Sequence, residues 1–91
     1  MCSSDLDEEL QFKVNARRNK YLGQWASKLL GYDEEKEKDY IQSVIKADFA
    51  ESGDEDVFKK IYEDLKKHNV SEEEIRKKMN ETMVLAKKDF S

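Results

Sequence analysis

The spacing of apolar residues predicts one long helix over residues 7–30. In its second half the apolar residues come in pairs one helical turn apart, a wide stripe suited to burial: Tyr21, Leu22, Trp25, Ala26, Leu29 and Leu30. In its first half the stripe thins to Leu10, Phe12 and Val14. At about 1.5 Å per residue the helix would span roughly 36 Å. We therefore expect its N-terminal end to extend beyond the rest of the protein.

Three shorter helices are predicted over residues 34–51, 55–68 and 72–89. Gly31 suits the end of the first helix, while Asp33 and Asp54 suit the starts of the second and third. Ser71 and Glu74 form a capping box that opens the fourth. The connections are short, so neighbouring helices should pack side by side. The sequence predicts an all-α fold, a small four-helix bundle with a long, partly protruding N-terminal helix.

The shorter helices each carry one apolar stripe for the core. The stripes consist of Tyr40, Ile41, Val44, Ile45 and Phe49, then Val57, Phe58, Ile61, Tyr62 and Leu65, then Ile75, Met79, Thr82, Met83, Ala86 and Phe90. Gly23 lies inside the first predicted helix, where glycine is about 1 kcal/mol less favourable than alanine. We expect it to allow another helix to approach closely.

The first six residues, MCSSDL, are interpreted as a leader that is not native. Codons for this hexapeptide, with GTG as the start, match the end of a common sequencing adapter. We therefore expect the native sequence to begin at Asp7 and a single four-helix domain to span residues 7–91. The alternative is an ordinary disordered N-terminus in which Ser4 or Asp5 caps the helix.

Composition narrows the possible functions. With 42% charged and 37% hydrophobic residues in 91, the chain makes one small domain with little room for a deep active-site pocket. A net charge of −4 argues against nucleic acid as a main partner. The single cysteine, Cys2, excludes an internal disulfide. No apolar run approaches a membrane span and no signal peptide opens the chain. The sequence predicts a cytoplasmic protein, monomeric when free, without a cofactor.

Two groups of residues raise the question of catalysis or metal binding. Asp54, Glu55 and Asp56 lack the spaced ligands of a calcium loop, and helix capping explains them better. Asp48 and His68 could form a half-buried acid–base pair. The alternative is an interhelical hydrogen bond at Asp48 and a histidine favoured at a helix C-terminus. No phosphate loop, metal-ligand spacing or nucleophile elbow is present, so we predict no enzyme.

A cationic group in the first helix is the main candidate for partner binding. Arg17, Arg18 and Lys20 have no acidic residue between them. With Leu10 and Phe12 nearby, they could dock on an acidic, partly apolar groove of another protein. The alternative, a merely solvated helix face, remains open from these residues alone.

Four motifs run along the chain: DEELQFK from Asp7, ARRNKYLGQWA from Ala16, ADFAESGDEDVFKKI from Ala47 and IRKKM from Ile75. Together they closely resemble the zeta subunit family of alpha-proteobacterial F-type ATP synthases, a family of ATPase inhibitors. The resemblance covers residues 7–91. It implies a four-helix bundle without a catalytic site that binds the catalytic head of the synthase, peripheral to the inner membrane. It also implies that an N-terminal helical segment inserts at a catalytic interface of that head.

The resemblance also bears on which residues bind and how well the chain inhibits. Family members carry an acidic and aromatic extension before the DEEL motif, and this extension is the inhibitory segment. Here MCSSDL stands in its place, so we expect the chain as written to bind but to inhibit poorly. The partner-binding residues that we nominate are Leu10, Phe12, Lys13, Arg17 and Arg18. The alternative function is a non-inhibitory structural or assembly module, or a helical adaptor.

Overall fold

The computed structural model describes the backbone of residues 3–50 and 54–90 and the side chains of residues 8–48 and 55–90. Within these ranges the chain is all-α, as the sequence predicts, and contains no strand. The helices in chain order are α1 (Ser3–Leu30), α2 (Glu34–Ala50), α3 (Asp54–Leu65), the short 3-10 helix η1 (Lys66–His68) and α4 (Glu72–Asp89).

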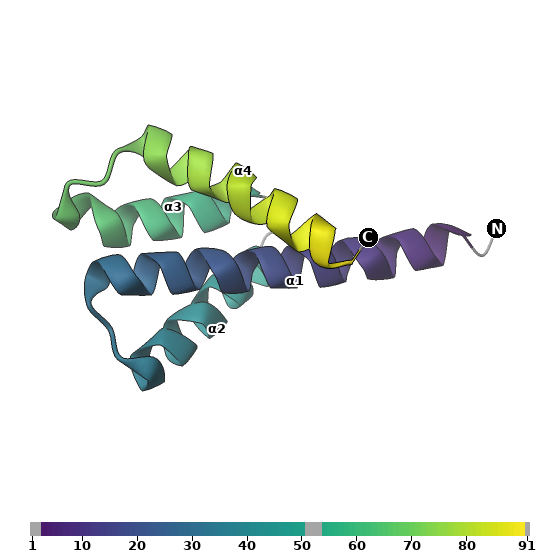
Figure 1. Ribbon diagram of the computed structural model, residues 1–91, viewed down its shortest axis with the longest axis horizontal. Coiled ribbons are helices and arrows are strands. Elements are labelled where there is room, and N and C mark those ends of the chain that lie inside the picture. Colours follow the sequence, from purple (N-terminus) through teal and green to yellow (C-terminus); the bar gives the residue numbers. More distant parts are fainter. Residues whose placement is uncertain (1–2, 51–53, 91) are drawn as a thin grey trace.

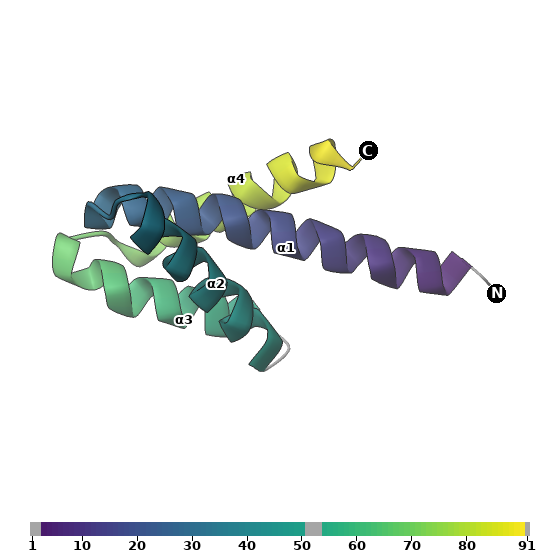
Figure 2. The same ribbon diagram turned by 90° about the horizontal axis from the view of Figure 1, so that it is seen from below.

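The α-helices form a small bundle organised around α1 (Figure 1). α1 contacts α2, α3 and α4, while α3 contacts both α2 and α4. The N-terminal part of α1 extends beyond α2 and α3, and the C-terminal end of α4 lies beside its middle (Figure 2). The molecule measures 47 × 27 × 25 Å, and its long dimension follows α1. The predicted four-helix bundle with a protruding first helix is confirmed.

Local chemistry fixes where the helices begin and end. Gly31 follows α1 with a φ of 77°, the left-handed conformation that glycine adopts most readily. The Asp33 carboxylate accepts a hydrogen bond from the backbone amide of Lys36 at 2.9 Å, which confirms it as the cap of α2. Ser71 Oγ accepts from the backbone amide of Glu74 at 3.3 Å and caps α4.

The end of α3 differs from the prediction. The sequence predicts that this helix continues to His68. In the structure the α-helix ends at Leu65, and residues 66–68 form the tighter 3-10 helix η1. Asn69 then adopts a left-handed φ of 61°, and its backbone amide donates to the Lys66 carbonyl at 3.3 Å. Asparagine is one of the few residues besides glycine that tolerate this conformation, and so it ends the helix here.

Several expectations fall at or beyond the limits of the described side chains. The backbone of α1 is helical from Ser3, so part of the MCSSDL leader continues the helix. The proposed caps at Ser4, Asp5 and Asp54 concern side chains outside the described residues. The interpretation of residues 1–6 as a non-native leader stays a prediction.

One face of each α-helix, together with Val70 between η1 and α4, contributes to a continuous core. Its buried residues are Leu22, Ala26, Tyr40, Val44, Val57, Phe58, Ile61, Leu65, Val70, Ile75 and Met79. The prediction that Leu29 is buried is wrong, because its side chain is 42% exposed. The covered face of α1 also includes Gly23 and Ser27, which are both buried. Leu29 follows the buried Leu22 by two helical turns and so lies on the same side of α1, but it is exposed in the last turn of the helix.

Gly23 marks a close contact between α1 and α2. A Cβ atom built on it would lie 2.7 Å from Cγ1 of Ile41 and 3.1 Å from its Cα. Real Cβ atoms do not approach other heavy atoms so closely, so only glycine fits without a shift of α2. The predicted role of Gly23 in helix approach is confirmed.

Candidate partner-binding groove

The N-terminal part of α1 is a solvent-exposed overhang. Every described side chain from Glu8 to Lys13 is exposed, including the apolar Leu10 at 45% and Phe12 at 53%. Val14, at 5%, is the first buried side chain along the described part of α1. Apolar side chains that a helix leaves in water are available to another protein surface.

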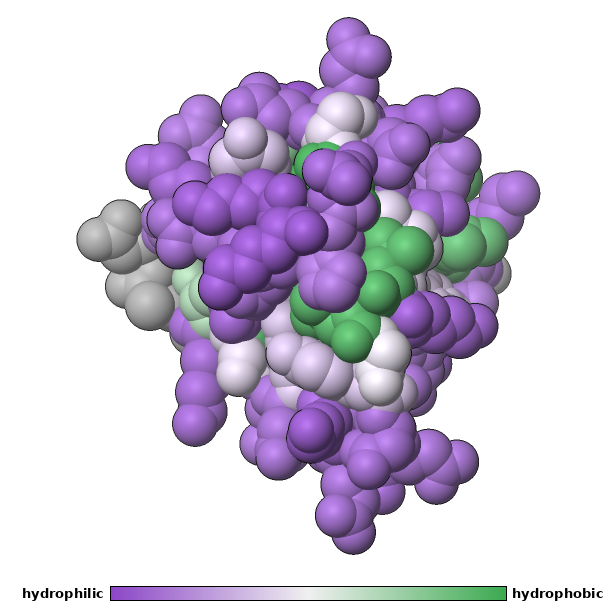
Figure 3. Space-filling model, turned by 90° about the vertical axis from the view of Figure 1, so that its left-hand side faces the viewer, coloured by the Kyte–Doolittle hydropathy of each residue, from purple (hydrophilic) through white to green (hydrophobic). Residues whose placement is uncertain are grey.

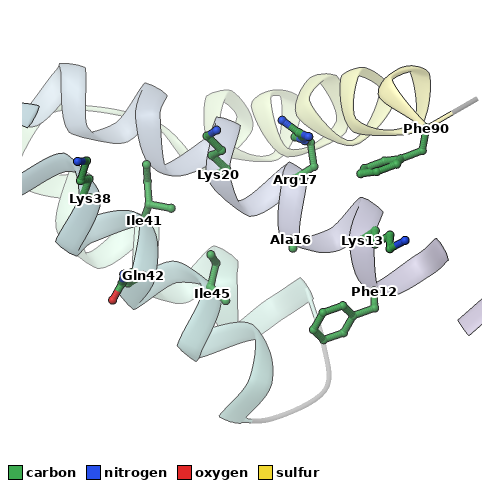
Figure 4. Close-up of a pocket in the computed structure, with 10 residues that line it drawn as sticks. All are labelled: Phe12, Lys13, Ala16, Arg17, Lys20, Lys38, Ile41, Gln42, Ile45 and Phe90. Carbon is green, nitrogen blue, oxygen red and sulfur yellow. The ribbon is translucent and has the colours of Figure 1, made fainter. Parts of the chain in front are cut away.

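A groove lies where this overhang meets the bundle. It has a volume of about 570 Å³ and is formed by α1, α2 and the residue that follows α4 (Figure 4). Its apolar lining consists of Phe12, Ala16, Ile41, Ile45 and Phe90, and its polar lining of Lys13, Arg17, Lys20, Lys38 and Gln42. The groove therefore combines an apolar surface with four basic side chains in a protein whose net charge is −4.

The C-terminal end of α4 is fastened to α1 beside the groove. The Tyr21 hydroxyl donates a hydrogen bond to the Asp89 carboxylate, and this bond raises the pKa of Tyr21. Arg17 Nε lies 3.9 Å from the same carboxylate, and the Arg17 guanidinium lies 5.6 Å from the centre of the Phe90 ring. These contacts hold Phe90 at the groove.

The four basic side chains differ in their pairing. Lys13 Nζ lies 3.7 Å from a carboxylate oxygen of Glu9, and Arg17 pairs with Asp89 as described. Lys20 and Lys38 are exposed, and neither has an ion-pair partner among the residues that the structure describes. The positive potential of the groove therefore comes mainly from these two lysines.

Arg18 lies in the interior of the bundle and does not line the groove. Its side chain is 1% exposed, and its guanidinium lies 3.9 Å from the Asp48 carboxylate. Asn19, equally buried, donates a hydrogen bond to Asp48 at 3.3 Å. The nomination of Arg18 as a partner contact is therefore not retained, because α2 and the bundle cover it. Asp48 and His68 do not form an acid–base pair: Asp48 makes the interhelical hydrogen bond that was the alternative, and His68 is exposed.

The structure thus separates the five nominated partner residues. Phe12, Lys13 and Arg17 line the groove together, whereas Leu10 lies further out on the overhang. The rest of the chain adds groove residues that were not nominated from the sequence: Lys38, Ile41 and Ile45 from α2, and Phe90 beyond α4. Ile41 and Ile45 were assigned to the core, but both are only half-buried. Ile41 follows Lys38 by one helical turn and Ile45 by two, and this spacing was the available signal.

Other surface features suit a partner less well. A smaller hollow of about 290 Å³ at the start of α2 contains Tyr32 and Lys36. There the Tyr32 ring packs edge-on against the Tyr40 ring, with 5.9 Å between the ring centres. Lys36 Nζ lies 5.8 Å from the centre of the Tyr32 ring, so Tyr32 and Lys36 are already engaged in contacts within the protein. The end of the bundle opposite the overhang is mostly hydrophilic, with limited apolar areas of which the largest lies right of centre in the view (Figure 3).

Within the described part of the chain, no three His, Cys, Asp or Glu side chains come together in a way that could hold a metal ion. No helix among the same residues combines the length and the apolar character that crossing a bilayer requires.

Comparison with known proteins agrees with the resemblance seen in the sequence motifs. The profile of one protein family, described as ATPase inhibitor subunit zeta, matches residues 4–89. A search of curated proteins gave no match. Because the matched residues cover nearly the whole chain, including all of α2, α3 and α4 and almost all of α1, this protein belongs to the ATPase inhibitor subunit zeta family.

Proposed function

We propose that this protein binds the catalytic head of a bacterial F-type ATP synthase and inhibits ATP hydrolysis through the N-terminal part of α1. The family match across residues 4–89 carries the proposal. The overhang of α1 supports it, because a helix that leaves Leu10 and Phe12 in water can enter an interface on another protein.

The physical logic of such inhibition is mechanical. A catalytic interface in a rotary head must open and close as the rotor turns. A helix wedged into a closed interface prevents opening and so stops hydrolysis, whereas rotation in the synthesis direction would expel the wedge. A short helix without support is only marginally stable in water. Ordering it on binding therefore costs free energy, which offsets part of the favourable interaction energy. The bundle holds this segment and adds contact surface.

The contacts that we propose are Leu10, Phe12, Lys13 and Arg17. Leu10 and Phe12 would supply the buried apolar centre of the interface, because exposed aromatic and aliphatic anchors carry most of the binding energy in such contacts. Lys13 and Arg17 would lie at its rim, where basic residues mainly affect the association rate and its dependence on salt.

ATP hydrolysis by a matched alpha-proteobacterial catalytic head, titrated with this protein, tests the proposal. A Leu10→Ala/Phe12→Ala variant should bind the head at least about tenfold more weakly, since two anchors are lost. Val84→Ala/Leu85→Ala is the matched control, because these α4 side chains are similarly exposed at 52% and 49%. Circular dichroism verifies that all forms fold.

The titration is repeated with a version that carries a family-type acidic and aromatic segment ahead of Asp7. The proposal is supported if either form inhibits hydrolysis, if Leu10→Ala/Phe12→Ala abolishes this inhibition, and if Val84→Ala/Leu85→Ala leaves it unchanged. Binding of the head without inhibition by either form would favour the assembly-module alternative. Absence of binding by both folded forms would refute the proposal.

A further inference from the structure

The groove has a chemistry that the overhang alone does not have. Phe12, Ile45 and Phe90 give it an apolar lining, and basic side chains stand along its length. Lys20 and Lys38 lie toward one end and Phe12 and Phe90 toward the other (Figure 4). An occupant must therefore present both apolar groups and negative charges, distributed along the length of the groove.

We propose that the groove receives an acidic amphipathic helix of the partner protein. The assignment rests on the proposed function, since the partner is then the catalytic head, and it names the kind of element that the groove binds. Lys13, Arg17 and Lys20 follow one another at intervals of one helical turn along α1. Carboxylates spaced by one turn on a second helix can meet such a row.

Charge complementarity selects an acidic occupant. Two of the four basic groups already face carboxylates: Lys13 faces Glu9, and Arg17 faces Asp89 on the groove's own rim. Lys20 and Lys38 have no such partner among the described residues and lie on opposite walls, one on α1 and one on α2. A carboxylate seated between them would gain from both charges. A basic helix would be repelled.

The apolar lining selects an amphipathic helix over a simple anion. Ile41 and Ile45 are half-buried and Phe12 is 53% exposed, so covering them removes apolar surface from water. Helices commonly bind in such grooves by laying an apolar face against them, with charged residues flanking that face. The groove of about 570 Å³ is continuous from α2 to Phe90, which fits side chains from successive helical turns.

The first arm of the test uses the catalytic head. Lys20→Glu/Lys38→Glu reverses the two unpaired charges, and Lys66→Glu/Lys67→Glu is the matched control, with the same change in net charge on exposed residues of η1. The groove variant should bind the head about tenfold more weakly and with a weaker dependence on salt. The control should bind as the unchanged protein does. Equal affinities of the groove variant and the unchanged protein would overturn the proposal.

The second arm does not depend on the head. A synthetic amphipathic helical peptide with glutamates flanking its apolar face is added to the unchanged protein, and backbone amide shifts are mapped by NMR. The same peptide with lysine in place of each glutamate is the control. Shifts around Lys20, Lys38 and Ile45 with the acidic peptide only would support the proposal. Equal responses to both peptides, or none, would overturn it.

The two arms separate failure of the groove assignment from failure of the proposed function. If the unchanged protein does not bind the head but the acidic peptide occupies the groove, the proposed function fails and the groove chemistry stands. Self-association measured by sedimentation, if abolished in Lys20→Glu/Lys38→Glu and retained in Lys66→Glu/Lys67→Glu, would assign the groove to a second copy of this chain. That result would overturn the choice of occupant.

Discussion

Replacing Gly23 by alanine tests the contact that sets α1 against α2. The added Cβ would meet Ile41 at two atoms, Cγ1 at 2.7 Å and Cα at 3.1 Å. The side-chain atom can move by rotation about χ1. The Cα atom can move only if the backbone of α2 shifts, so part of the clash persists whatever rotamer Ile41 adopts.

The magnitude follows from two opposing effects. Alanine favours the helix by about 1 kcal/mol over glycine. Forcing an extra methyl group into a packed contact destabilises by about 1–3 kcal/mol. We expect Gly23→Ala to lower the free energy of unfolding by about 1 kcal/mol, which for a domain of this size lowers Tm by roughly 4–8 °C.

A double-mutant cycle with Ile41→Ala isolates the clash. Truncation of Ile41 removes the contact at 2.7 Å and leaves the one at 3.1 Å, so Gly23→Ala should then be close to neutral in stability. The coupling energy should be about 1 kcal/mol. Urea denaturation followed by circular dichroism measures all four proteins, and the midpoint and the slope m are compared separately.

Gly31→Ala provides the control for this cycle. Its φ of 77° strains alanine, yet no atom lies within 4 Å of the added Cβ. It should therefore destabilise equally with and without Ile41→Ala. If Gly23→Ala instead stabilises the otherwise unchanged protein, the close approach of α2 to Gly23 is refuted, because only the helix-propensity gain would then be acting.

Three further predictions concern other parts of the fold. Arg18→Met should lower the free energy of unfolding by about 2 kcal/mol in urea titrations, because Asp48 loses its buried cation; adding Asp48→Asn should recover most of the loss, because it removes the unpaired charge and keeps an acceptor for Asn19. Ser71→Ala should cost about 1 kcal/mol in the same assay, since the α4 cap is lost. Burial and the negative charge of Asp64 raise the pKa of Tyr40, so the folded state keeps this proton when the unfolded state loses it. Stability should therefore fall as the pH rises above about 10, and it should fall less in Tyr40→Phe.

Helix positions were predictable from the sequence because their signals are local. A cap such as Asp33 acts on a backbone amide three residues away, and Gly31 ends α1 through its own φ. The core stripes of α3 and α4 were predictable for a similar reason, since side-chain periodicity within one helix determines which face is apolar. None of these inferences needs a contact between helices.

The candidate site was only partly predictable because it depends on contacts between helices. Arg17, Arg18 and Lys20 look alike in sequence. Their environments differ because Asp48, on another helix, lies close enough to Arg18 to pair with it while Arg17 faces the C-terminal end of α4. Periodicity likewise assigned Ile45 to the core. It could not show that α1 leaves part of that face uncovered.

The same helix crossing that stabilises the fold also shapes the groove. Gly23 lets α2 come close to α1 through Ile41, and further toward the end of α2 the longer side chains of Arg18 and Asn19 reach Asp48. Ile41 contacts Gly23 and also lines the groove, so it links the two. A change at Gly23 that shifts α2 should alter binding in the groove, although Gly23 is not among its lining residues. Leu10 on the overhang should keep its exposure, because no buried side chain is described before Val14.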